Sequence, residues 1–158
     1  MAVCVLDALR SAGAVFASAE SCTGGNIAHR ITLLPGSSEV FVGAVVSYAT
    51  RVKTDVLGVP AATIASEGVV SLATAEAMAQ GVRRLLATDY AVATTGVAGP
   101  TGGTGLTPVG TVCIAVASNN VTNSKRFVFG NDRAENIERA TTEAFAMLLD
   151  LIKSEKSS

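Results

Sequence analysis

The sequence predicts an α/β fold, a three-layer α/β/α sandwich built on a mixed, mostly parallel sheet. Helical patterns alternate with short apolar strands along most of the chain, which is typical of a sheet covered by helices on both faces. Near the C-terminus two strand patterns follow one another across a polar turn, so the sheet is expected to be mixed rather than wholly parallel. The chain has 158 residues, 49% of them hydrophobic, and a single domain over 1–158 is expected, with a polar tail at about 153–158 that frays.

The first half of the chain predicts helices and strands in turn from periodicity and from Gly and Pro stop signals. The expected elements are a helix over 3–12 that ends at Gly13, a buried strand over 14–18, a helix with Ile27, Ile31 and Leu34 on one face that ends at Pro35-Gly36, a strand over 40–48, and a short helix over 51–57.

The second half continues the alternation and then changes to a hairpin. Ser66 is expected to cap a longer helix whose apolar residues Val69, Leu72, Met78, Val82 and Leu85 face the core. The remaining expected elements are a strand over 89–95, a glycine-rich loop over 96–108, a hairpin of 109–118 and 124–129, and a last helix opened by Asp132 and Glu135 as a capping box.

Composition excludes several classes of function. The net charge is −1 with no basic block, so neither nucleic acid nor a membrane surface is an expected partner. The three cysteines are far apart and the chain has one histidine, so neither a metal site nor a disulfide framework is indicated. Without a secretion signal or a long apolar run, a reducing cytoplasm is the expected location.

Three polar clusters each follow one of the first three expected strands. They cover residues 21–25, 48–53 and 94–103. Because ligands of open α/β sheets bind beyond the carboxyl ends of the strands, parallel neighbouring strands would bring all three clusters to one edge. The sequence therefore predicts a small-molecule site at that edge.

The cluster Ser21–Gly25 opens a helix with hydroxyls, a thiol and glycines. Free N–H groups at such a position favour an anion or a developing oxyanion, although Ser21 or Thr23 as a plain N-cap explains the same pattern. Cys22 is a candidate nucleophile, with a buried structural thiol as the alternative. His29, the only histidine, lies two helical turns further on, too far along the helix for a Ser-His-Asp triad.

Tyr48 and Lys53 flank the end of the second strand. A lysine desolvated in a cleft can lose its proton and act as a base, and a tyrosine hydroxyl can relay that proton or orient the serine. The alternative is a solvated lysine beside a tyrosine that covers the core. The loop Gly96–Gly103 can present N–H groups to a phosphate or an oxyanion, or it can be a mobile connection. Arg133 can clamp a phosphate or carboxylate.

Five blocks of sequence resemble the CinA C-terminal domain family, which includes the bacterial nicotinamide-nucleotide amidase. The blocks are Ala19-Glu20-Ser21-Cys22-Thr23-Gly24-Gly25, Gly36-Ser37-Ser38, Val46-Ser47-Tyr48, Gly96-Val97-Ala98-Gly99-Pro100 and Pro108-Val109-Gly110-Thr111-Val112. They occur in the family's order and span nearly the whole chain. The N-terminal domain of full-length CinA proteins is expected to be absent.

The resemblance implies an α/β/α domain that deamidates nicotinamide mononucleotide, a small-molecule nucleotide substrate, to nicotinic acid mononucleotide and ammonia. It further implies no metal or cofactor, and a homodimer or higher homo-oligomer. By position, Ser21 would be the nucleophile, Lys53 the base and Tyr48 its helper. The residues that would line the substrate site are Thr23, Gly24, Gly25, Thr50, Gly96, Gly99 and Arg133.

Two blocks depart from the family pattern. Tyr48-Ala49-Thr50 replaces a frequent Tyr-Ser-Asn, and Gly130-Asn131-Asp132-Arg133 replaces Pro-Gly-Asp-Arg. If the amide lost at Thr50 contacted the substrate, its absence would cost about 1–3 kcal/mol. Two alternatives therefore stay open, which are a nucleotide-binding or interaction module without turnover and an amidase for a different small amide.

Overall fold

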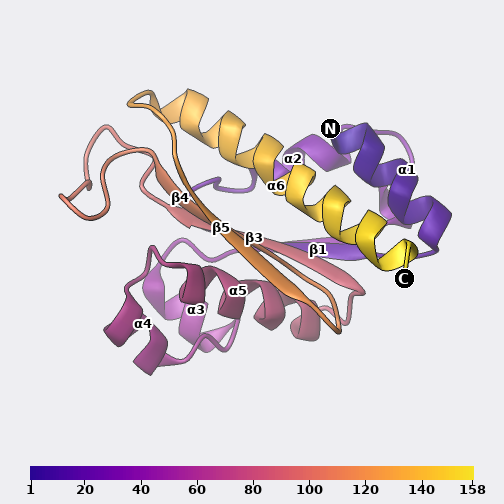
Figure 1. The fold of residues 1–158 in the computed structure, drawn as a ribbon, viewed down its shortest axis with the longest axis horizontal. Helices are drawn as coiled ribbons and strands as arrows, with labels where there is room; N and C mark the ends of the chain where they lie inside the picture. The colour runs from indigo at the N-terminus through magenta and orange to yellow at the C-terminus, as the bar shows by residue number, and fades with distance from the viewer.

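The computed structural model describes all residues 1–158 as one five-stranded sheet with helices on both faces (Figure 1). The elements are α1 (Ala2–Ala12), β1 (Phe16–Glu20), α2 (Asn26–Thr32), the 3₁₀ turn η1 (Ser37–Glu39), β2 (Phe41–Val46), α3 (Thr50–Asp55), α4 (Ala61–Glu67), α5 (Leu72–Leu85), β3 (Tyr90–Gly96), β4 (Thr111–Ala117), β5 (Thr122–Val128) and α6 (Arg133–Lys156).

The sheet is mixed, as predicted, and four of its five strands run in the same direction, with β4 opposed to them. Its strand order is β2-β1-β3-β4-β5, and β1 is parallel to both β2 and β3 while β4 is antiparallel to β3 and to β5. In the register Glu20 lies beside Val46 on one side and Thr94 on the other. The carboxyl ends of the three parallel strands therefore meet at one edge, and the segments that follow them meet there too.

The two faces of the sheet have different cores. Helices α1, α2 and α6 cover one face with larger apolar side chains such as Phe16, Phe145 and Leu148, and α3, α4 and α5 lie on the other (Figure 1). On the α5 face the sheet contributes mainly alanines. A Cβ at Gly81 of α5 would lie 2.0 Å from the Leu57 carbonyl oxygen, so glycine permits this close approach. Small residues therefore allow close packing on this face.

Several boundaries differ from the sequence prediction. Ser66 lies inside α4, which ends at Gly68, and α5 is capped instead by Ser71, whose Oγ accepts from the Thr74 N–H at 3.1 Å. The tail is helical to Lys156, because buried Leu151 and Ile152 hold the last turns of α6 against the core. By contrast, the Gly13 stop of α1 and the Asp132 cap of α6 are confirmed. None of the helices combines the length and apolar character that crossing a membrane requires.

Glu20, the last residue of β1, fixes the start of α2. Its buried carboxylate accepts from the Ile27 and Ala28 N–H groups at 2.9 and 3.1 Å and from the hydroxyls of Thr23 and Ser18 at 2.7 and 3.1 Å. Burying a carboxylate is costly unless hydrogen bonds compensate it, and these four do so. The turn over residues 21–25 is thereby held at both of its ends.

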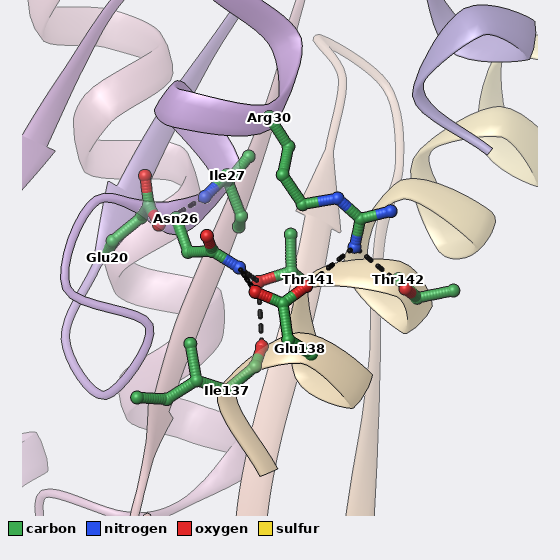
Figure 2. Close-up of polar contacts among 8 residues, drawn as sticks. All are labelled: Glu20, Asn26, Ile27, Arg30, Ile137, Glu138, Thr141 and Thr142. Carbon is green, nitrogen blue, oxygen red and sulfur yellow. Dashed lines mark hydrogen bonds and ion pairs between the residues drawn. The ribbon is translucent and has the colours of Figure 1, made fainter. Parts of the chain in front are cut away.

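Helix α2 is in turn tied to α6 (Figure 2). Asn26 Nδ2 donates to the Thr141 hydroxyl at 2.8 Å and to Glu138 Oε1 at 3.1 Å, and Arg30 donates to the Thr142 hydroxyl at 2.9 Å. These contacts link the turn after β1 to the helix that begins at Arg133.

Replacing Glu20 by Gln is expected to lower the free energy of unfolding by about 2–4 kcal/mol. The new NH₂ group would face hydrogen-bond donors and could not accept the bonds that the carboxylate oxygen accepts. Urea unfolding followed by circular dichroism measures this. Glu39→Gln is the matched control, since its pair with Arg10 is exposed and should contribute less than about 1 kcal/mol. Equal effects of the two changes would contradict the role assigned to Glu20.

Candidate functional site

A cleft of about 360 Å³ opens at the edge where the parallel strands end, within the range typical of small-molecule sites. Its walls come from the turn after β1, the segment after β2, the connection between α4 and α5, the end of β3 with the loop that follows it, and the first residue of α6. The lining residues are Ser21, Cys22, Tyr48, Val69, Thr95, Gly96, Val97, Ala98, Gly99, Thr101, Gly102 and Arg133.

Ser21, which lines the cleft, is in direct contact with the buried Lys53, which does not line it. Ser21 follows β1 immediately, and its N–H donates to the Thr94 carbonyl at 3.0 Å, which holds the turn against β3. Lys53 Nζ lies 3.0 Å from Ser21 Oγ, 2.5 Å from the Ser47 carbonyl oxygen and 3.5 Å from the Tyr48 carbonyl oxygen. The two carbonyls can only accept hydrogen bonds, whereas the Ser21 hydroxyl can donate to a neutral amine.

The surroundings of Lys53 favour its neutral form. The side chain is 1% exposed, and the three ion pairs of the structure all join other residues, so no carboxylate compensates an ammonium here. Burial lowers the pKa of Lys53 below its ordinary value of 10.5. A lysine of this kind can accept the proton of the hydroxyl that it contacts.

The lowered pKa of Lys53 predicts a pH dependence of stability. Between the folded pKa and 10.5 the unfolded chain carries a proton on Lys53 that the folded chain lacks, so the free energy of unfolding should rise with pH across this window. Lys53→Met removes this contribution while leaving the other titrations in place. The difference in unfolding free energy, parent minus variant, should therefore increase with pH in urea titrations, and a flat difference would contradict a depressed pKa.

Cys22 lies beside Ser21 but is unsuited to act as a nucleophile. Burial raises the pKa of its thiol to about 12, so the thiol stays protonated at ordinary pH. This supports the structural reading of Cys22 over the nucleophilic one.

Tyr48 and Arg133 meet at the outer end of the cleft. Arg133 donates to the Tyr48 hydroxyl at 3.0 Å and to the Gly99 carbonyl at 2.7 Å. Tyr48 is 61% exposed, and its contact with Lys53 is made by its backbone carbonyl rather than its hydroxyl. The direct contact between Lys53 and Ser21 leaves no gap for the expected tyrosine relay.

Backbone N–H groups without a protein acceptor border the cleft. Those of Cys22, Ala98 and Gly99 donate to no other protein group, in contrast to that of Val97, which bonds the Thr111 carbonyl. Such groups are ready donors for an oxyanion or a phosphate.

Four of the expected substrate residues do not line the cleft. The Thr23 hydroxyl is buried and bonded to Glu20 and to Thr94 at 2.8 Å, so it supports the turn from beneath. Gly24 and Gly25 have φ of 59° and 100° and shape the turn rather than the cleft wall. Thr50 is exposed at the first residue of α3 and does not line the cleft.

Three residues that build the site have no role assigned from the sequence, although Glu20 and Ser47 lie in the blocks that resemble the family. Glu20 anchors the turn of Ser21, Ser47 supplies the carbonyl nearest to Lys53, and Asn136 joins α6 to the loop after β3. A carboxylate that ends an apolar strand is a signal for the first. The other two act through the backbone or across distant segments, which no local pattern reveals.

Comparison with known proteins identifies similar chains over nearly the whole length. A family model described as CinA C-terminal domain matches residues 1–152. A CinA-like protein of Salinibacter ruber is 51% identical over 132 residues, which cover 84% of this chain and 32% of that protein. One of Chloroherpeton thalassium is 43% identical over 152 residues, covering 94% and 36% respectively. The chain thus spans about a third of the length of the curated relatives it matches.

Solved structures share the fold at sequence identities of about one third. The competence/damage inducible protein CihA of Agrobacterium tumefaciens superposes with a TM-score of 0.93 and 36% identity, covering 95% of this chain and 92% of that one. A competence-damaged protein (CinA) superfamily protein of Klebsiella pneumoniae gives a TM-score of 0.93 with 33% identity, covering 97% and 96%.

Proposed function

The chain belongs to the CinA C-terminal domain family, and we propose that it is an amidohydrolase that converts nicotinamide mononucleotide to nicotinic acid mononucleotide and ammonia. The observation that carries the proposal is the 3.0 Å contact between Ser21 Oγ and the buried, uncompensated amine of Lys53. A serine next to a neutral lysine is an activated nucleophile for acyl transfer.

In the acylation step Lys53 acts as the base. Its two N–H groups point to the carbonyls of Ser47 and Tyr48, and its lone pair receives the Ser21 proton as Oγ attacks the carboxamide carbon. The tetrahedral intermediate collapses when the Lys53 ammonium returns this proton to the leaving nitrogen, and ammonia departs. An ester on Ser21 remains.

The deacylation step repeats this chemistry with water. Lys53 takes a proton from water as its oxygen attacks the ester carbon, and it then protonates Ser21 Oγ as the carboxylic acid leaves. The N–H of Cys22, the residue after the nucleophile, is the donor we assign to the oxyanion in both steps, because it is free and lies on the same turn.

The substrate phosphate is assigned to the end of the cleft at Arg133, the one charged side chain among the lining residues. Tyr48 is assigned to holding that guanidinium through its hydroxyl rather than to proton transfer. Gly96 and Gly99 would form the wall between this end and Ser21.

The test is an assay for ammonia release by the purified chain. Nicotinamide mononucleotide would be compared with nicotinamide, nicotinamide riboside, asparagine and glutamine, with products identified by chromatography. Ammonia from the mononucleotide, with nicotinic acid mononucleotide as co-product, would support the proposal. Release from another amide alone would indicate a different amidase. Nucleotide binding in calorimetry without any ammonia would indicate a binding module.

A further inference from the structure

Two side chains on the first turn of α6 hold two successive carbonyls of the loop after β3. Arg133 donates to the Gly99 carbonyl at 2.7 Å, and Asn136, three residues further on, donates to the Ala98 carbonyl at 3.0 Å. Residues three apart lie on the same face of a helix, so both reach the loop from one side.

All hydrogen bonds of the Asn136 side chain are made with backbone groups. It is 1% exposed, and its Nδ2 donates to the Gly130 carbonyl at 2.9 Å as well as to Ala98, while its Oδ1 accepts from the Gly130 N–H at 3.0 Å. Both of its N–H donors are thus occupied, and it does not line the cleft. Any influence of Asn136 on a bound molecule must pass through the loop that it holds.

Because the peptide group is planar, the direction of the Ala98 carbonyl also fixes the direction of the Gly99 N–H. In a trans peptide the C=O of one residue and the N–H of the next point in opposite directions. With the Ala98 carbonyl directed to Asn136, the Gly99 N–H is directed away from α6. That N–H has no protein acceptor, and Gly99 lines the cleft next to Arg133.

We propose that Asn136 is a positioning residue for the substrate phosphate, which it serves by aiming the Gly99 N–H into the Arg133 end of the cleft. The inference rests on the proposed function for the identity of the ligand. The phosphate, rather than the oxyanion, is the group concerned, because Arg133 lies at this end and the free Cys22 N–H lies beside Ser21.

The test is ligand binding by calorimetry in a Ser21→Ala background, where turnover does not interfere. Nicotinamide mononucleotide is compared with nicotinamide riboside, which lacks only the phosphate. Asn136→Leu, which keeps the size and adds no charge but removes both N–H donors, should weaken nucleotide binding about tenfold or more, because a charge-assisted hydrogen bond is misaligned. Binding of the nucleoside should be unchanged.

The nucleoside serves as the internal control for folding. Equal weakening of both ligands would show that Asn136 has only a structural role and would overturn the inference. Phosphate-dependent weakening, together with no ammonia release by the parent chain that retains Ser21, would support the inference while refuting the amidase, so the two proposals fail separately.

A second measurement needs no variant and covers the case in which Asn136→Leu does not fold. Inorganic phosphate is titrated into the ¹⁵N-labelled parent protein, and the amide resonance of Gly99 is followed. A saturable downfield shift of this resonance, larger than that of Val97, whose N–H is already bonded, is the expected result. An unmoved Gly99 resonance would overturn the inference.

Discussion

Replacement of Ser21 by Ala is expected to lower ammonia release from nicotinamide mononucleotide by about four to six powers of ten, the usual result of removing a nucleophile from a covalent mechanism. No neighbouring group can take its place. The Cys22 thiol is protonated because burial raises its pKa to about 12, and Lys53 then has only water to activate. The initial rate of ammonia formation at saturating substrate measures the effect.

The matched control for this change is Ser37→Ala, a serine of similar burial on η1, away from the cleft. It should leave the rate within about twofold, since substitutions away from functional features have small effects. Trapping of the acyl ester on the peptide that contains Ser21, followed by mass spectrometry, gives independent evidence. Undiminished turnover by Ser21→Ala would exclude the serine mechanism.

Replacement of Lys53 by Met is expected to lower kcat/KM by about two to four powers of ten, the usual contribution of a general base. Met keeps the length and the apolar stem but cannot accept the Ser21 proton. In the parent, kcat/KM should fall as the pH drops through the pKa of Lys53, which burial lowers from 10.5. The variant should lose this limb of the profile, because it has no group there to protonate.

Lys125→Met is the control, since Lys125 is exposed on β5 and is not among the residues that line the cleft. It should keep both the rate and the shape of the pH profile. A Lys53→Met variant that kept the parent's acid limb would show that another group is the base. Circular dichroism of both variants verifies that any loss arises in a folded protein.

Much of the fold was predictable because the determining interactions are local. Gly13 can adopt the left-handed conformation that ends α1, and the Asp132 side chain bonds an N–H three residues later, so both signals are contained in a short segment. The cap of α5 is Ser71 rather than the predicted Ser66, and the local sequence does not distinguish them, because both serines precede apolar periodicity. The choice between them depends on where Gly68 ends α4, which is settled by packing.

The meeting of Ser21 and Lys53 was also predictable, because parallel strands deliver their following segments to one edge. The partners of the other site residues were not. Tyr48 binds Arg133 and Thr23 binds Glu20 because of side-chain directions that only the packed structure determines. Asn136 gave no periodic signal, since a single buried amide in an amphipathic helix looks like an ordinary polar position.

The two members of the Ser21–Lys53 pair are anchored in opposite layers of the sandwich. Ser21 is held by the turn that Glu20 fastens to α2, whereas Lys53 belongs to α3 beneath the other face of the sheet (Figure 1). The distance between Ser21 Oγ and Lys53 Nζ therefore depends on how the two helical layers are positioned relative to each other. A small shift of one layer would separate Lys53 from Ser21 while every helix and strand remained formed. The proposed activity therefore requires the correct alignment of the layers in addition to a folded chain.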